Sequence, residues 1–461
     1  MPATVLAASP SAVPRIDPRT RLLLEAPIAR TLVRLAAPNM LVMVAQASVG
    51  LIETYFVGWL GTNALAGVAL VFPPLMLMQM MSAGAMGGGI SSAVARALGA
   101  GRREDGDALA LHALVIAAGF GLAFTGAALF GGPWLYAVSG GRGASLEAAL
   151  TYSNVIFSGA VLVWIFNSLA NVIRGTGNMM VPATVSIVGA AVLLPLSPAL
   201  ILGLGPLPRL GVAGGATAVL FYYAAGSLVL WAYLQLGKSV VTLRLARLRW
   251  PLFRDILRIG LVASLITVQT NLTIAIATAF VGRFGPAAIA GYGTGARLEY
   301  LLVPLVFGLG GPLVALVGTN IGAGRRERAV RTAWIGAAIA VALTETIGLV
   351  AASFPRAWIG LFGSDPSMLD AGTRYLHTVG PFYGLFGLGM ALYFASQGAG
   401  RLLWPLLANF ARLLIAAIGG WVALHATGNL TLVFLALSVA LAAFGLINAV
   451  AVWRGAWFSR G

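Results

Sequence analysis

Long apolar runs separated by short polar or basic segments make up almost the whole chain. About twelve runs reach the ~20 residues that an α-helix needs to cross a membrane. They lie near 35–60, 64–95, 108–131, 146–172, 182–204, 211–236, 253–282, 287–318, 329–353, 369–396, 405–425 and 430–453. Uninterrupted runs of this length are typical of transmembrane helices, so the pattern predicts an all-α membrane protein.

The composition agrees with this class. Of 461 residues, 59% are hydrophobic and 9% are charged, whereas soluble domains carry about 25% charged residues. The chain has no cysteine and only three scattered histidines. We therefore expect no thiolate chemistry, no metal site and no bound cofactor.

The net charge of +16 would suit nucleic acid, but its distribution indicates a membrane topology. Counted with both termini inside, the inner segments hold about 22 of the 29 Lys and Arg residues. This asymmetry follows the positive-inside rule. It predicts a multi-pass protein of the bacterial inner membrane with both termini cytoplasmic, whose arginines meet anionic lipids. No nucleic-acid partner is expected.

The N-terminal segment lacks the apolar core near Met1 that a cleaved signal peptide would show. Its Pro/Ala/Ser-rich composition predicts a disordered cytoplasmic tail. The predicted division is a tail (1–30), an N-lobe (31–236), a cytoplasmic linker (237–252), a C-lobe (253–453) and a second tail (454–461).

Three sequence blocks recur in the second half of the chain, 223 or 224 residues further on. FVGWLGTNALAG (56–67) matches FVGRFGPAAIAG (280–291), LGAGRRED (98–105) matches IGAGRRER (321–328), and RGTGNMMVP (174–182) matches QGAGRLLWP (397–405). Each half holds six runs, an even number, so the halves share one orientation. The repeat is therefore parallel, with substrate sites expected near the bilayer midplane.

These blocks, with LGPLPRLGVAGGATA (204–218), resemble the multidrug and toxic compound extrusion (MATE) transporters over about residues 30–455. The resemblance implies a V-shaped pair of six-helix lobes in a monomer. It also implies export of small, drug-like and often cationic compounds, driven by inward flow of protons or sodium ions.

Glu53 is the first candidate for ion coupling. It lies within the first apolar run, where an ionised carboxylate costs at least ~2.5 kcal/mol, so such residues are functional by default. It resembles the Asp of the first helix in MATE transporters. Gln46 lies about 20° off the same helical face and is expected to line the same cavity. The alternative is that Glu53 reaches the outer interface.

Other family carboxylates are missing. The Asn and Asp of the fifth helix in sodium- or proton-coupled relatives align with Leu193 and Ser197, and Phe386 stands where some members carry an Asp on the tenth helix. Because sodium needs several oxygen ligands and proton exchange needs one carboxylate, a proton is the expected coupling ion.

Two further acids lie in the second half, and each has a structural alternative. Glu299 is a second coupling candidate, but it can instead pair with an arginine such as Arg412. Glu345 is a third candidate that can instead form a helix–helix hydrogen bond. Arg412 itself must face a cavity or a carboxylate.

Polar and aromatic residues within the runs are the remaining candidates. Those expected to line the substrate cavity are Asn154, Asn167, Asn171, Gln269, Asn271, Tyr300 and Tyr383. Hydrogen bonding between helices and an aromatic interface belt are the alternative roles.

An enzyme is not expected. The GKS at 237–239 lacks the first glycine of a P-loop, since Ala232 stands there, and no strand precedes it. We therefore expect a secondary active exporter of organic cations that alternates access between two lobes. The rival interpretations are a lipid-linked precursor flippase, an exporter of one metabolite, a channel and a membrane scaffold.

Overall fold

The computed structural model describes residues 17–458, excluding the side chains of residues 46–51, 53, 300 and 301. Its described residues are helical, with turns and loops but no strand. Eleven helices are long and apolar enough to span a membrane, or twelve when a pair bent by 47° is counted as one span. The prediction of an all-α protein with about twelve spans is confirmed.

The helices fall into two groups that follow the two halves of the chain. The first contains α2 (Ile28–Gly58), α3 (Thr62–Gln79), the π-helix η1 (Met80–Met86), α4 (Gly87–Gly99), α5 (Arg103–Val138), α6 (Gly143–Ser158), α7 (Ala160–Gly175), α8 (Met180–Leu202) and α9 (Val212–Gln235). The second contains α10 (Trp250–Gly282), α11 (Pro286–Ala296), α12 (Glu299–Gly322), α13 (Arg326–Ser353), α14 (Pro355–Ile359), α15 (Pro366–Val379), the 3₁₀ turn η2 (Gly380–Phe382), α16 (Tyr383–Ala399), α17 (Leu403–Val422), the π-helix η3 (Ala423–Thr427) and α18 (Leu430–Trp453).

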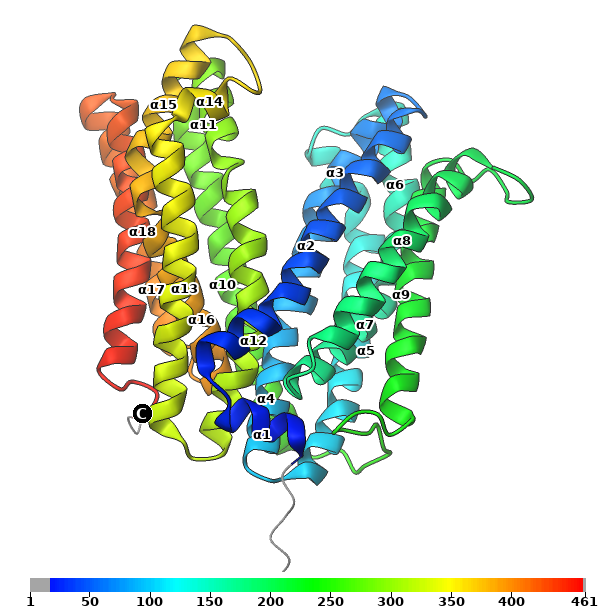
Figure 1. Ribbon diagram of the computed structural model, residues 1–461. Coiled ribbons are helices and arrows are strands. Elements are labelled where there is room, and N and C mark those ends of the chain that lie inside the picture. Colours follow the sequence, from blue (N-terminus) through cyan, green and yellow to red (C-terminus); the bar gives the residue numbers. More distant parts are fainter. Residues whose placement is uncertain (1–16, 459–461) are drawn as a thin grey trace, which may run out of the picture.

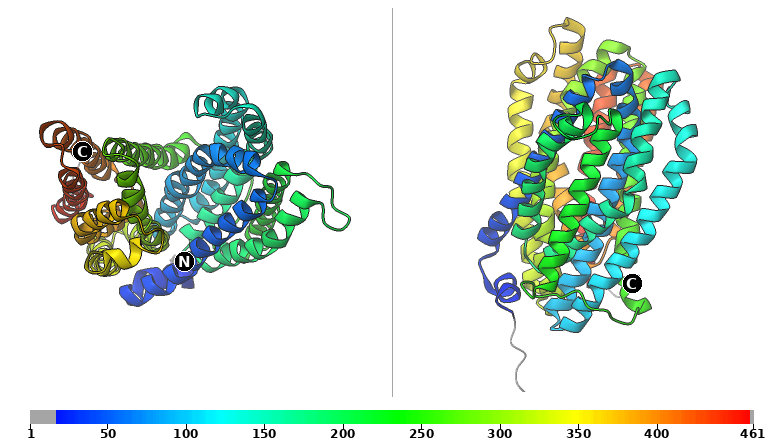
Figure 2. Two further views of the ribbon diagram at one scale, coloured as in Figure 1. Left: turned by 90° about the horizontal axis from the view of Figure 1, so that it is seen from above. Right: turned by 90° about the vertical axis from the view of Figure 1, so that its right-hand side faces the viewer.

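The two groups form lobes arranged as a V (Figure 1). The lobes meet at the end where α4 and α12 lie and diverge towards the opposite end. Seen from above, they stand as two separate clusters of helices (left view of Figure 2). The expected V-shaped pair of lobes is confirmed.

Equivalent glycines allow the same close helix contact in both lobes. A Cβ on Gly67 of α3 would lie 2.7 Å from the backbone nitrogen of Ala149 in α6. A Cβ on Gly291 of α11 would lie 2.4 Å from the carbonyl oxygen of Met368 in α15. Small residues let membrane helices approach closely, so this repeated block of sequence preserves a repeated packing contact.

Two other glycines hold the lobes together. A Cβ on Gly99 of α4 would lie 2.1 Å from the carbonyl oxygen of Thr319, and a Cβ on Gly322 of α12 would lie 2.1 Å from that of Arg96. Gly99 and Gly322 occupy matching places in the GAGRR blocks. The contact between α4 and α12 is therefore reciprocal, and it requires a residue without a Cβ at both positions.

Polar groups reinforce this interface between the lobes. Arg96 of α4 forms an ion pair with Asp255 of α10, at 2.7 Å. The Ser92 hydroxyl donates to the carbonyl oxygen of Gln397 at 2.6 Å, and the Gln397 amide donates to that of Ala85 at 3.3 Å. The lobes are thus closed on each other at this end by both packing and hydrogen bonds.

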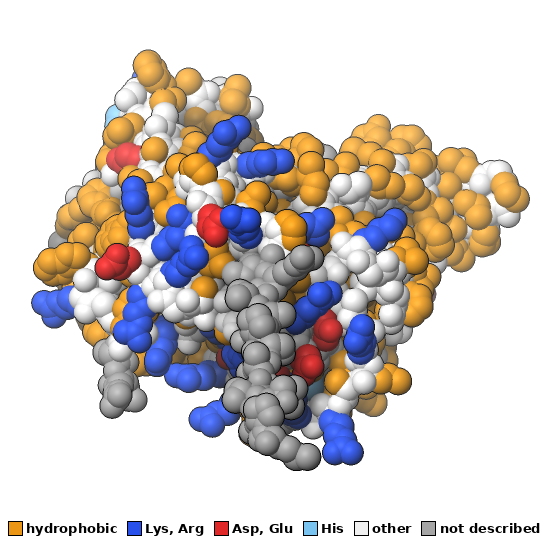
Figure 3. All heavy atoms as spheres, turned by 60° about the horizontal axis from the view of Figure 1, so that its bottom comes forward, with side chains coloured by type: hydrophobic (Ala, Val, Ile, Leu, Met, Phe, Trp, Pro, Cys, Tyr) orange, Lys and Arg blue, Asp and Glu red, His pale blue; other side chains and the backbone are white. Residues whose placement is uncertain are grey.

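Lysine and arginine side chains gather over the same end of the molecule (Figure 3). We call it the basic end. A short helix, α1 (Pro18–Glu25), lies here (Figure 1), which differs from the disordered tail predicted for residues 1–30. The Asp17 carboxylate accepts the N–H of Arg19 at 2.8 Å, and Leu23 and Leu24 are buried. Local capping and apolar burial together explain why this segment is ordered.

Candidate functional site

A partly buried carboxylate in the C-lobe has two tyrosines beside it. Glu299 is the first residue of α12, and the hydroxyl of Tyr375 in α15 donates to its Oε1 at 2.7 Å. The hydroxyl of Tyr383, at the start of α16, lies 3.4 Å from that of Tyr375. Tyr375 is 2% exposed and Tyr383 1%, so three separate helices position one partly buried carboxylate against buried phenol groups.

The guanidinium of Arg412 supplies the opposite charge. It comes from α17, is 8% exposed and lies within electrostatic range of Glu299. Its Cζ is 5.7 Å from the centre of the Phe444 ring. Tyr292 and Phe434 pack edge-on against Tyr375, with ring centres 5.1 and 5.2 Å away. Glu299 therefore faces a fixed cation in aromatic surroundings, where charge interactions are strong.

A helix break places Glu299 in this position. The sequence predicted one run over 287–318, but α11 ends at Ala296 and α12 begins at Glu299. Arg297 lies at the break with its Cζ 5.2 Å from the Phe362 ring centre. The structure thus brings Glu299 towards Arg412, the pairing given as the structural alternative. No direct ion pair joins the two among the described residues, and a carboxylate that is only influenced by a nearby cation can still take up or release a proton.

Glu345 has a different environment. Its Oε2 accepts the backbone N–H of Gly384 at 2.6 Å, in the first turn of α16. The first N–H groups of a helix lack partners within the helix, so this carboxylate satisfies one of them. The structure places Glu345 in the helix–helix hydrogen bond that was the alternative to a coupling role.

The asparagines of α7 bind the irregular segment η1. The Asn167 amide donates to the Ser82 hydroxyl at 2.9 Å, and the Asn171 amide donates to the carbonyl oxygen of Ala83 at 3.2 Å. A π-helix shifts the backbone hydrogen-bond pattern of the helix that contains it. Asn167 and Asn171 are thus buried between helices, beside this shifted backbone.

The remaining polar candidates divide between buried and exposed positions. Gln269 of α10 is buried, and its Oε1 accepts the amide of Asn409 in α17 at 3.2 Å. Asn271 is exposed and donates to the carbonyl oxygen of Thr267 at 2.9 Å. Asn154 is exposed on α6. Within the part of the chain that the structure describes, no hydrogen bond joins these three residues to Glu299.

Three candidates lie outside the described residues as far as their side chains are concerned. They are Gln46, Glu53 and Tyr300. The coupling role of Glu53 and the cavity roles of the other two stay predictions.

Sequence reasoning missed Tyr375, the hydrogen-bond donor to Glu299. Tyr375 is separated from Glu299 by 76 residues, and no local motif joins them. Its position on the buried side of α15, beside Ala371 and Val379, would have marked it as a core residue only.

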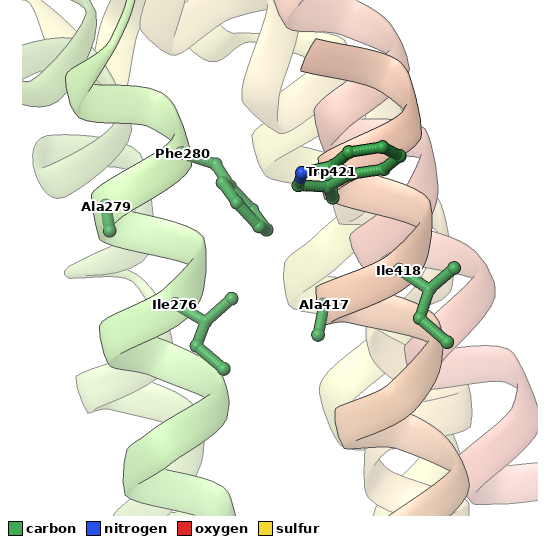
Figure 4. A pocket seen from close by; sticks show the side chains of 6 residues that line it. All are labelled: Ile276, Ala279, Phe280, Ala417, Ile418 and Trp421. Atoms are coloured by element: carbon green, nitrogen blue, oxygen red, sulfur yellow. The ribbon is translucent and has the colours of Figure 1, made fainter. Parts of the chain in front are cut away.

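An apolar hollow of about 420 Å³ lies between α10 and α17. Figure 4 shows Ile276, Ala279 and Phe280 on one helix and Ala417, Ile418 and Trp421 on the other. It has no charged lining residue, so it offers nothing to orient a cation or hold a proton. The Glu299 cluster is therefore the better candidate site.

The sequence of this chain is similar to a family model and to several known transporters. The MatE family model matches residues 38–199 and 263–422. The FAD transporter of Shewanella oneidensis is 28% identical, over 87% of this chain and 90% of that protein. The probable multidrug resistance protein NorM of Thermotoga maritima is 26% identical, over 83% and 82%.

A solved structure supports the fold as well. The crystal structure of MATE in the bent conformation matches with a TM-score of 0.86 and 23% identity, covering 96% of this chain and 99% of that one. Because the family model spans both lobes and most of the spanning helices, the chain belongs to the MATE family of transporters.

Proposed function

We propose that this protein is a secondary active exporter of organic cations and drug-like compounds, driven by protons entering the cell. The observation that carries this proposal is the partly buried carboxylate of Glu299, hydrogen-bonded to Tyr375 and within electrostatic range of Arg412 in a chain of the MATE family. A proton or a cationic cargo that reaches Glu299 competes with Arg412 for the same negative charge. Such competition is the physical basis of antiport.

The surroundings of Glu299 support protons over sodium. Its described neighbours are two phenol hydroxyls and a guanidinium, and hard cations need several oxygen ligands around one site. The two oxygen-bearing residues expected on the fifth helix are also replaced, by the buried Leu193 and Ser197. One carboxylate that takes up a proton is sufficient for this chemistry.

Alternating access follows from the interface at the basic end. In the proposal, the lobes 31–236 and 253–453 rock about this interface, and the basic end faces the cytoplasm of a bacterial cell. With Gly99 against Thr319 and Gly322 against Arg96, the lobes in this proposal are closed on the inner side and open on the outer side. Glu53 is proposed as a second coupling carboxylate in the N-lobe, with Gln46 on the same wall.

A second cargo is favoured by one relative. The FAD transporter of Shewanella oneidensis is 28% identical over most of both chains. A flavin nucleotide is therefore the alternative cargo, and Arg412 is the residue that would attract its phosphates.

Transport in inverted membrane vesicles tests both proposals. Uptake of ethidium and of FAD is measured with an imposed proton gradient and, separately, with a sodium gradient. We expect ethidium uptake that follows the proton gradient and is impaired by Glu299→Gln and abolished by Glu53→Gln, because an amide cannot carry a proton. FAD uptake without ethidium uptake would show that the cargo is a flavin nucleotide and not an organic cation. Full proton-driven uptake by both Glu53→Gln and Glu299→Gln would refute the coupling site.

A further inference from the structure

The two lobes carry opposite charge at matching places on the basic end. Residues 325–331 (RRERAVR), which begin α13, hold four arginines and one glutamate. The matching segment 102–108 (RREDGDA), which begins α5, holds two arginines and three acidic residues. The N-lobe segment can therefore serve as the reference for what the additional positive charge does in the C-lobe segment.

In the N-lobe the arginines find a carboxylate within the protein. Asp105 accepts from Arg102 at 3.0 Å and from Arg249, just before α10, at 2.6 Å. The residue that matches Asp105 in the C-lobe is Arg328. The internal counter-ion of the N-lobe is therefore replaced by one more cation.

In the C-lobe, three of the arginines share one face of the chain. Arg325, Arg328 and Arg331 follow at intervals of three residues, which places them side by side on a helix. Arg325 donates to the carbonyl oxygen of Leu24 at 2.8 Å, and Arg328 donates to that of Ala26. We call these three residues the arginine triad.

The triad has no directly paired carboxylate in the part of the chain that the structure describes. None of its three members is in an ion pair there, and the buried Nε of Arg328 has no hydrogen-bond partner. Glu25 lies within electrostatic range, but Arg21 already binds it at 2.8 Å. Like charges held this close are unfavourable unless an anion joins them.

The position of the triad indicates which anion would bind. The triad lies at the basic end beside α1 and the start of α2, where Leu22 and Val33 expose apolar side chains. A hollow of about 390 Å³ adjoins Arg331 and is lined also by Arg326, Glu327, Val330 and Phe458. Guanidinium groups bind phosphate through paired hydrogen bonds, and anionic lipids concentrate at the cytoplasmic leaflet.

We propose that the arginine triad binds the phosphate of an anionic phospholipid headgroup. The headgroup would neutralise Arg325, Arg328 and Arg331 as Asp105 neutralises its arginines in the N-lobe. It would also hold α1 against α13. Since α1 reaches the N-lobe through a hydrogen bond from Arg19 to the Tyr233 hydroxyl at 3.1 Å, the lipid would favour the closed basic end.

The test is lipid binding to the purified, delipidated protein in a neutral detergent. Thermal stability and native mass spectrometry are followed while phosphatidylglycerol, phosphatidylcholine or inorganic phosphate is added. We expect phosphatidylglycerol to bind at least about tenfold more tightly than phosphatidylcholine. Equal effects of phosphatidylglycerol and phosphatidylcholine, or of phosphatidylglycerol and inorganic phosphate, would overturn the assignment to an anionic lipid.

Three variants assign the binding to the triad. Arg328→Asp restores the residue found in the N-lobe and should remove the preference for phosphatidylglycerol. Arg331→Gln, at an exposed side chain, should weaken it about fivefold without harm to folding. Arg103→Gln removes an exposed charge from the matching N-lobe loop and should leave the preference unchanged. Wild-type lipid preference in both triad variants would refute the site, whatever the transport assays show.

Discussion

Gly322 of α12 lies directly against the carbonyl oxygen of Arg96 in α4, with 2.1 Å between that oxygen and the place of a Cβ. Contacts of this length do not occur, so Gly322→Ala must push the lobes apart at the basic end. We expect the variant to fold but to lose efflux, because the closed state is no longer reachable.

The measurement uses the absence of cysteine from this chain. Ser92→Cys introduces one thiol at a fully buried position of the interface. In Gly322→Ala it should react with an impermeant reagent from the basic end, whereas the Ser92→Cys protein alone should not. Gly119→Ala, at a glycine of α5 with no atom within 4 Å of its added Cβ, is the control and should behave as wild type. Protection of the thiol in Gly322→Ala would show that the interface adapts.

The ion pair between Arg96 and Asp255 contributes to the same equilibrium. Asp255 is about half exposed, and pairs at that exposure contribute at most about 1 kcal/mol. We therefore expect Asp255→Asn to leave thermal stability nearly unchanged and to increase labelling of the Ser92→Cys thiol by up to about fivefold. Unchanged labelling would show that the pair does not influence closure.

Tyr375→Phe tests the hydrogen bond to Glu299. The variant keeps the ring, removes the donor and should cost about 1–2 kcal/mol of stability. Since the donor favours the ionised carboxylate, its loss should move the pH of half-maximal efflux upward. Tyr136→Phe removes a buried hydrogen bond of the same length, 2.7 Å to Ser153, in the other lobe. It should lower stability similarly, with no shift of the pH profile; a shift in both variants would count against a special role for Glu299.

Glu345 should respond as a structural residue. Glu345→Gln keeps an oxygen that accepts the Gly384 N–H, so we expect near wild-type stability and proton-driven efflux. Glu345→Ala leaves that N–H unpaired and should cost about 1–3 kcal/mol of stability, with the pH profile of efflux unchanged. Loss of proton coupling in a well-folded Glu345→Gln protein would instead make Glu345 a coupling residue.

The spanning helices and the repeat could be predicted because both depend on local composition. Run length and the spacing of matched blocks give the twelve-span, two-lobe architecture without knowledge of any contact. The helix break at Arg297 and the bond between Tyr375 and Glu299 could not be predicted, since they depend on how helices rotate and pack against each other. α1 was predictable in principle from Asp17 and Pro18, a cap followed by a first-turn proline, but its composition favoured disorder.

The π-helix η1 lies where the two halves of the chain differ in length by one residue. Gly67 corresponds to Gly291, 224 residues further on, whereas Leu98 corresponds to Ile321, 223 residues further on. The first half therefore has one extra residue between these points, and η1 (Met80–Met86) lies there, whereas the matching part of α12 is a regular α-helix. A π-bulge is a way for a helix to absorb an inserted residue without turning everything after it by 100°. The N-lobe thus accommodates one more residue than the C-lobe, whose matching segment is broken between Ala296 and Glu299, and Gly99 and Gly322 still end in reciprocal contacts with the other lobe.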